Sequence, residues 1–133
     1  MAAGTVKPTP SERELEVMSV LWDLGSGTVA EVRQELNDTF EPDVAYTTVL
    51  TMLRSLRAKG WARVEEEGRA HRYFPAVQLD EARRESLHRL TDLFYNGSRA
   101  LLLTELVSDR RLRAPELQRL RLLLDERLKG ARP

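Results

Sequence analysis

The stretch Ala45-Tyr-Thr-Thr-Val-Leu-Thr-Met-Leu-Arg-Ser-Leu-Arg-Ala-Lys-Gly60 decides the fold of this 133-residue chain. Its apolar residues recur at helical spacing, which predicts an amphipathic helix over residues 43–59. Asp43 is the expected N-cap, and Gly60 is the expected left-handed residue that ends the helix. The buried stripe is expected to consist of Val49, Met52, Leu53 and Leu56.

The first turns of this helix are short and polar, as a helix that reads DNA requires. Such a helix enters the ~12 Å major groove and places its first side chains at the base edges, where threonine offers a hydroxyl and a methyl group. Threonines near a helix start also act as caps, and exposed arginines are usually solvated. The predicted DNA contacts at this end are Tyr46, Thr47, Thr48 and Thr51. The predicted phosphate contacts behind them are Arg54, Arg57 and Lys59.

Two helices are expected before this stretch, and each begins with a capping box. Ser11 stands three residues before Glu14, and Thr28 stands three residues before Glu31. At this spacing each side chain of the pair caps the backbone amide of the other residue. The Gly25-Ser26-Gly27 turn is expected to separate the two helices.

Two extended runs follow the long helix, at residues 61–65 and 69–74, and Gly68 between them indicates a β-hairpin. For His71 in the second run, a phosphate contact and a solvent-facing position without a special role are both open. The hairpin residues that are expected to meet the flanking DNA backbone are Arg63, Arg69 and Arg72.

The remainder of the chain, from residue 77 on, predicts helices only. It contains fifteen leucines and three segments with helical character, at residues 80–95, 98–108 and 115–129. A segment of this size buries too little apolar surface by itself, so its leucines favour a core shared between two copies. The residues predicted to form this dimer contact are Leu90, Phe94, Leu102, Leu106, Leu117, Leu120 and Leu124.

These elements predict a mainly α-helical protein with a small β-hairpin. A winged helix-turn-helix DNA-binding domain is expected over residues 1–76, followed by an α-helical dimerisation region over residues 77–133. The same plan also serves as a protein–protein docking or architectural module. A docking module is therefore the alternative to DNA binding at this point.

Composition agrees with a soluble cytoplasmic protein. Hydrophobic residues make up 41% of the chain and charged residues 32%. The longest apolar run has four residues, Ala100 to Leu103, and the N-terminus has no signal-peptide pattern. The net charge is zero, but residues 1–43 carry −6 while residues 44–76 and 77–133 carry +3 each. A basic island therefore lies in the middle of the chain, at residues 44–76.

Catalysis, cofactors and metal binding are not expected. The chain has no cysteine, and its two histidines, His71 and His88, form no metal-ligand pair. It also lacks a nucleophile elbow, a phosphate-binding glycine loop and a dinucleotide fingerprint. The three glutamates at residues 65–67 lie at the expected tip of the hairpin. Carboxylates there would be solvated, so they are not expected to act as a catalytic pair. The sequence therefore does not predict an enzyme.

Four segments together resemble the penicillinase repressor (BlaI/MecI) family. They are Glu14-Leu-Glu-Val-Met-Ser-Val-Leu-Trp22, Thr28-Val-Ala-Glu-Val32, the stretch 45–60, and Arg69-Ala-His-Arg-Tyr-Phe-Pro75. The run Leu93-Phe-Tyr-Asn-Gly97 is similar to the start of the family's dimerisation region. The resemblance implies a homodimeric repressor on palindromic operators of β-lactamase, cell-wall or related stress genes. It also implies inactivation through a membrane-bound sensor protease.

The chain departs from this family pattern at several positions. Members often carry basic residues where this chain has Leu50 and Ser55, which leaves the operator sequence open. The bond that corresponds to the family's regulatory cleavage site lies at about Thr104–Glu105. Protease-controlled members present an asparagine followed by an aromatic residue there, and this chain has neither. The cysteine-rich hook of the copper-sensing branch is excluded because cysteine is absent.

Overall fold

The computed structural model describes residues 8–131 and divides into two compact units, the first ending at Arg83 and the second beginning at Arg84. The division falls inside the helix α4 (Leu79–Phe94), seven residues after the functional boundary that the sequence places at residue 76. Residues 1–7, where the sequence predicts no signal peptide, lie outside the described part, as does the Glu67 side chain. Among the described helices, none is both long and apolar enough to cross a membrane.

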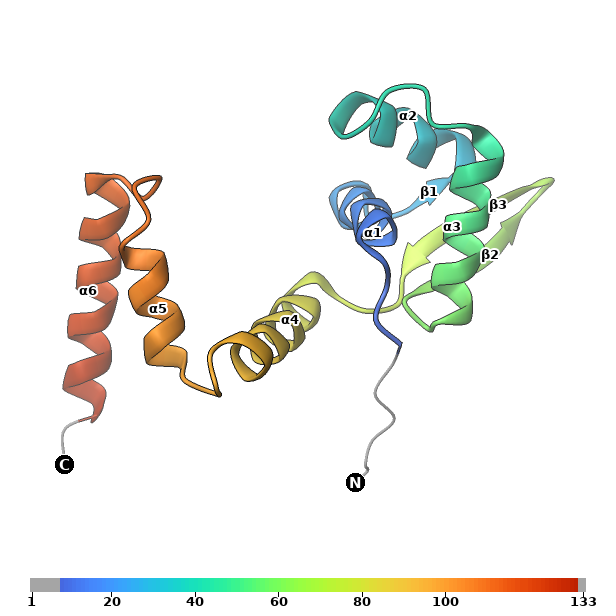
Figure 1. The fold of residues 1–133 in the computed structure, drawn as a ribbon. Helices are drawn as coiled ribbons and strands as arrows, with labels where there is room; N and C mark the ends of the chain where they lie inside the picture. The colour runs from blue at the N-terminus through green and yellow to red at the C-terminus, as the bar shows by residue number, and fades with distance from the viewer. Residues whose placement is uncertain (1–7, 132–133) are drawn as a thin grey trace. The chain divides into compact units, whose positions relative to one another are not determined.

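The first unit packs three helices against a small antiparallel sheet (Figure 1). The helices are α1 (Glu12–Leu24), α2 (Val29–Thr39) and α3 (Tyr46–Ala58), and the strands are β1 (Gly27–Thr28), β2 (Ala62–Glu67) and β3 (Ala70–Pro75). The strand order is β1-β3-β2, with Thr28 opposite Arg72 and Val64 opposite Tyr73. A mainly α-helical, winged helix-turn-helix fold is therefore confirmed.

Both predicted capping boxes are present. The Ser11 hydroxyl accepts from the Glu14 amide at 3.2 Å, and the Glu14 carboxylate accepts from the Ser11 amide at 2.8 Å. Thr28 and Glu31 exchange the same pair of bonds at 3.2 and 2.9 Å. Each box satisfies amides that the start of a helix leaves without a partner.

The expectation about the glycine turn was incomplete. Gly25, with a φ of 82°, ends α1 as predicted, but Gly27 and Thr28 go on to form β1 along β3. A two-residue strand leaves no alternating pattern in the sequence, so only the pairing partner reveals it.

The predicted start of α3 was wrong by three residues. Ala45 is the N-cap, and Asp43 lies before the helix in the left-handed conformation, with a φ of 63°. The chain must turn sharply between α2 and α3, and aspartate is among the residues that tolerate this conformation best. The Val44 amide donates to Asn37 Oδ1 at 2.9 Å, and Arg33 Nε donates to the Val44 carbonyl at 2.8 Å. Gly60, with a φ of 82°, follows the helix as predicted.

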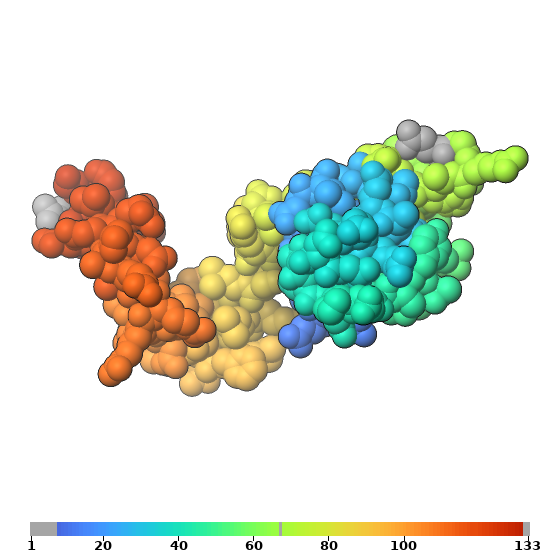
Figure 2. Space-filling view, turned by 90° about the horizontal axis from the view of Figure 1, so that it is seen from above, coloured from blue at the N-terminus to red at the C-terminus, as the bar shows by residue number. Residues whose placement is uncertain are grey.

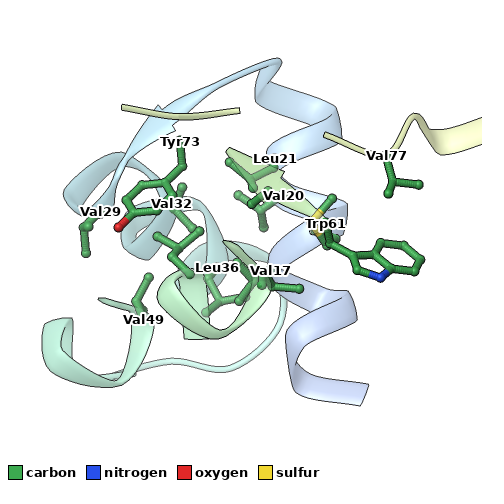
Figure 3. Close-up of a cluster of buried hydrophobic side chains, with 14 of the residues drawn as sticks. Val17, Val20, Leu21, Val29, Val32, Leu36, Val49, Trp61, Tyr73 and Val77 are labelled. Carbon is green, nitrogen blue, oxygen red and sulfur yellow. The ribbon is translucent and has the colours of Figure 1, made fainter. Parts of the chain in front are cut away.

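The core of the first unit joins all three helices to the sheet. Figure 3 shows Val17, Val32, Leu36 and Tyr73 among its side chains. Val77 extends the core beyond the hairpin, and its carbonyl accepts from the indole of Trp22 at 2.9 Å. Because Val77 and Ala82 are both buried with this core, the compact unit reaches past residue 76.

The second unit consists of the rest of α4 together with α5 (Arg99–Val107) and α6 (Ala114–Ala131). These helices agree with the three predicted segments to within two residues at each end. Asn96 and Gly97, with φ values of 49° and 76°, form the break between α4 and α5. The Ser98 side chain then caps α5 by accepting from the Leu101 amide at 3.1 Å.

Candidate nucleic-acid interface

The buried face of α3 fixes which of its side chains point outward. Val49, Leu53 and Leu56 are fully buried, whereas Met52 and Leu50 are only partly buried against the same core. On a helix, residues three, four and seven apart share a face. Thr47, Thr51 and Arg54 have this spacing and are exposed. The structure therefore brings two predicted base contacts and one predicted phosphate contact onto a single outward face.

The polar groups at the start of α3 differ in what they can still bind. The Thr51 hydroxyl donates to the Thr47 carbonyl at 2.8 Å, so its oxygen and its methyl group remain for contact with another molecule. Thr48 is half-buried, and Tyr46 is 48% exposed. The N-cap Ala45 supplies no side-chain cap, so among the described residues the first amides of α3 make no hydrogen bond to their N-cap side chain. Helix amides in this state attract anions such as phosphate.

Lys59 lies at the opposite end of α3 and has a partner inside the protein. Its ammonium group forms an ion pair with the Glu14 carboxylate, whose side chain is only 8% exposed. Burial raises the pKa of Glu14, but hydrogen bonds from Lys59, Ser55 and the Ser11 amide together lower that pKa to about 2. Glu14 therefore connects the start of α1 to the end of α3. This contact holds the end of α3, and the phosphate contact of Lys59 stays a prediction.

The predicted arginines of the hairpin fall into two groups. Arg63 pairs with Glu65 at 2.7 Å and lies over the Phe74 ring, 4.3 Å from its centre. Arg72 is 28% exposed and contacts Ser26 and Glu31 at the start of α2. Arg69 and His71 are exposed near the turn of the hairpin, which projects from the body of the first unit in Figure 2.

Three arginines are thus available to a polyanion. Arg54 and Arg57 on α3 and Arg69 on the hairpin are exposed, and their side chains make no hydrogen bond or ion pair with any side chain that the structure describes. Glu65 and Glu66 are also exposed on the hairpin, which weakens its attraction for phosphate. The main positive charge that remains for a ligand therefore lies on α3.

Sequence reasoning missed the residues that hold this interface in place. Asn37 and Arg33 fix the turn before α3, and Glu14 fixes its end. The capping-box pattern identifies Glu14 and Glu31 as caps, but it carries no sign of their second contacts, to Lys59 and Arg72. Those contacts join residues 45 and 41 positions apart in the chain. No local spacing rule reaches over such distances.

The second unit presents a large apolar surface. Most of the predicted dimer contacts are exposed or half-buried, with Phe94 at 74%, Leu106 at 49% and Leu124 at 47% exposed. Leu102 differs because it is buried inside the unit. The other predicted dimer residues are Leu90 and Leu117, which are exposed, and Leu120, which is half-buried. Leu120 also lines a groove of about 390 Å³ between α5 and α6, together with Leu103, Leu106 and Leu112.

The predicted cleavage bond lies inside α5. Thr104 and Glu105 are exposed, and the Thr104 hydroxyl donates to the Ala100 carbonyl at 2.8 Å. The Thr104 carbonyl accepts from the Ser108 hydroxyl at 2.8 Å. A protease would therefore have to unwind this part of α5 before the peptide bond could enter an active site.

Comparison with known proteins identifies the family. The penicillinase repressor family model matches residues 10–126. A penicillinase repressor of Bacillus licheniformis is 31% identical over 121 residues, which cover 90% of this chain and 91% of that protein. The solution structure of the DNA-binding domain of the repressor BlaI is 35% identical, with a TM-score of 0.50 over 59% of this chain and 93% of the domain. The chain therefore belongs to the penicillinase repressor family and is a DNA-binding transcriptional repressor, not an enzyme.

Proposed function

We propose that this repressor acts as a homodimer, in which each copy places the start of α3 in the major groove of a palindromic operator. The observation that carries the proposal is the exposed face of α3, where Thr47 and Thr51 lie beside Arg54. Threonine side chains suit base edges, and the arginine behind them suits phosphate. Tyr46, Thr48 and Arg57 flank this face and extend the contact.

Several observations support roles for the other predicted site residues. Arg69 and His71 are exposed on the hairpin and are placed to meet the DNA backbone beside the groove. Lys59 acts through Glu14 by holding the end of α3. Arg63 is tied to Glu65 and Phe74, so it contributes less charge than its position in the hairpin suggests.

The apolar surface of the second unit supports the dimer. Many leucines of α4, α5 and α6 are exposed, and contiguous exposed apolar surface is typical of an interaction site. A second copy would cover them and would double the number of reading helices. Two copies related by a two-fold axis match an operator whose half-sites are related by the same symmetry.

We further propose that the regulated genes are those of β-lactamase, cell-wall or related stress functions, and that the protein works in the cytoplasm, where the DNA is. As the family resemblance implies, we propose that a membrane-bound sensor protease is the partner that inactivates the repressor. Here, Glu105 would bring a charge into the pocket of a protease that prefers an aromatic residue. Desolvating that charge costs several kcal/mol unless a basic group meets it. Such a protease should therefore cut the Thr104–Glu105 bond slowly.

The proposal is tested by selection from a pool of random-sequence DNA duplexes, followed by gel-shift titration of the recovered duplex. The expected result is a palindromic sequence that binds two copies of the chain. Recovery of a non-palindromic sequence bound by one copy would contradict the proposed dimer. Failure to enrich any sequence would contradict operator recognition by α3.

A further inference from the structure

Arg72 connects the hairpin to the start of α2. It lies in β3, the central strand of the sheet, opposite Thr28 of β1 and Glu65 of β2. Its Nη1 donates to Ser26 Oγ at 3.1 Å, and its Nη2 lies 3.0 Å from Glu31 Oε1. With 28% of its side chain exposed, Arg72 is the most enclosed of the three hairpin arginines.

Glu31 serves two partners at once. Its carboxylate accepts from the Thr28 amide at 2.9 Å, which completes the capping box of α2, and it also pairs with Arg72. The hydrogen bond from the Thr28 backbone, opposed by partial burial and aided by the charge of Arg72, lowers the pKa of Glu31. The carboxylate is therefore ionised at neutral pH and balances the guanidinium charge.

We propose that Arg72, Ser26 and Glu31 form a clasp that sets the angle between the hairpin and the helix-turn-helix. In this clasp Arg72 is a positioning residue and not a phosphate contact. This inference rests on the proposed mode of DNA binding, because the angle matters only when α3 and the hairpin meet the same duplex. It deepens that proposal by leaving Arg69 and His71 as the hairpin residues directed to the backbone.

Electrostatics favours a positioning role. A phosphate that binds Arg72 would lie close to the Glu31 carboxylate, which already pairs with the same guanidinium. The repulsion of that carboxylate would offset much of the attraction of the arginine. An arginine that keeps its carboxylate adds almost no net charge to the DNA-facing surface.

The test compares variants on the duplex selected by the unmodified protein, using fluorescence anisotropy over a range of salt concentrations. Glu31→Gln retains the capping box, because glutamine caps as well as glutamate, but it removes the charge that pairs with Arg72. Arg72→Gln removes the opposite partner. The expected result is that each variant binds roughly twofold to fivefold more weakly, with no change in the salt dependence. The double variant should bind no more weakly than Arg72→Gln alone.

A phosphate contact predicts the opposite behaviour. In that case Arg72→Gln would lower the slope of log affinity against log salt by about 0.9 per lost contact. Glu31→Gln would then bind more tightly, because a repulsive charge is lost. Either result overturns the proposal. If the unmodified protein selects no duplex at all, the proposed function fails before the clasp is tested.

A variant in which the two charges are exchanged keeps the test decisive if the single variants fail to fold. The Arg72→Glu/Glu31→Arg double variant reverses the pair while giving up the glutamate cap of α2. Recovery of DNA affinity relative to Arg72→Glu alone, with the original salt slope, would support the clasp. Unfolding of the single variants together with no recovery in the exchanged pair would contradict it. Arg13→Gln is the matched control, because it breaks an exposed ion pair, with Glu41, that lies outside the clasp and outside the predicted DNA contacts.

Discussion

The two units of this repressor bury their apolar residues to different extents. In the first unit, sixteen residues from α1, α2, α3, the start of α4, the sheet and their connections form one buried cluster. In the second unit, Thr91 and Leu102 are the buried residues among those described, and α6 buries none. A helix with an apolar stripe and no buried residue gains little from folding alone. The first unit therefore buries its core within one chain, whereas the second leaves apolar surface exposed that the proposed dimer would cover.

The largest effect is expected from charge on the apolar stripe of α6, which consists of Leu117, Leu120, Leu124 and Leu128. Leu120→Glu combined with Leu124→Glu would bring four carboxylates into the interface of a dimer. Each buried, unpaired charge costs roughly several kcal/mol, so the double variant should sediment as a monomer. Its first unit should keep its fold and bind a half-site weakly. Gln118→Glu, on the same helix but off the stripe, is the control and should remain dimeric.

A double variant that sediments as a dimer with unchanged affinity for the full operator would contradict the placement of Leu120 and Leu124 in the interface.

The complementary change acts on the core of the first unit. Leu53→Ala removes a fully buried side chain from α3 and should lower the free energy of unfolding by about 2–5 kcal/mol. The loss should be independent of protein concentration, because the core lies within one chain. Leu122→Ala removes the same atoms from a side chain that is 68% exposed, so its effect shows how much of Leu122 the dimer covers. Chemical denaturation at two protein concentrations measures both effects.

The ion pair between Glu14 of α1 and Lys59 at the end of α3 makes the stability of the first unit depend on pH. The folded-state pKa of Glu14 is about 2, below the ordinary value of 4.5, so its ionised form stabilises the folded state. This contribution, at most about 3 kcal/mol, should be complete above pH 4.5 and should fade as the pH falls towards 2. Glu14→Gln keeps the capping box and loses the charge. The stability difference between the two proteins should therefore be largest near pH 7 and vanish near pH 2.

The smallest predicted effect distinguishes base contacts from phosphate contacts on α3. Thr47→Ala should change the preference among operator variants by about 1–3 kcal/mol at one base-pair position. Arg54→Ala should instead weaken binding to every sequence and lower the salt slope by about one unit. Gel-shift titration on a panel of single-base operator variants measures both. Uniform weakening on all sequences by Thr47→Ala would exclude Thr47 as a base contact.

The sequence was sufficient to predict the helices, both capping boxes, the hairpin and the family. These features rest on local patterns, such as the spacing of Ser11 and Glu14 or the positive φ of Gly60. The start of α3 was misplaced because Asp43 is a good cap by type, while the turn after α2 requires it in a left-handed conformation. A sequence pattern gives no sign of that tertiary requirement.

Contacts between distant segments account for the rest of what the sequence could not predict. Lys59 and Arg72 look alike as exposed basic residues in the sequence, yet each meets a carboxylate from an earlier helix. Leu102 carries the same apolar signal as Leu106, but it is buried inside the second unit while Leu106 is half exposed. Side chains of the same type acquire different roles only when the fold brings their neighbours together.

Hydroxyl-radical footprinting of the whole protein on its selected duplex tests the central claim most directly. The account predicts two equally protected patches, related by two-fold symmetry and separated by about 34 Å or a multiple of that distance. The Leu120→Glu/Leu124→Glu variant, at concentrations where it still binds, should protect the two patches independently. One asymmetric patch from the unmodified protein would contradict an arrangement in which two copies, joined by their second units, each read a half-site with α3.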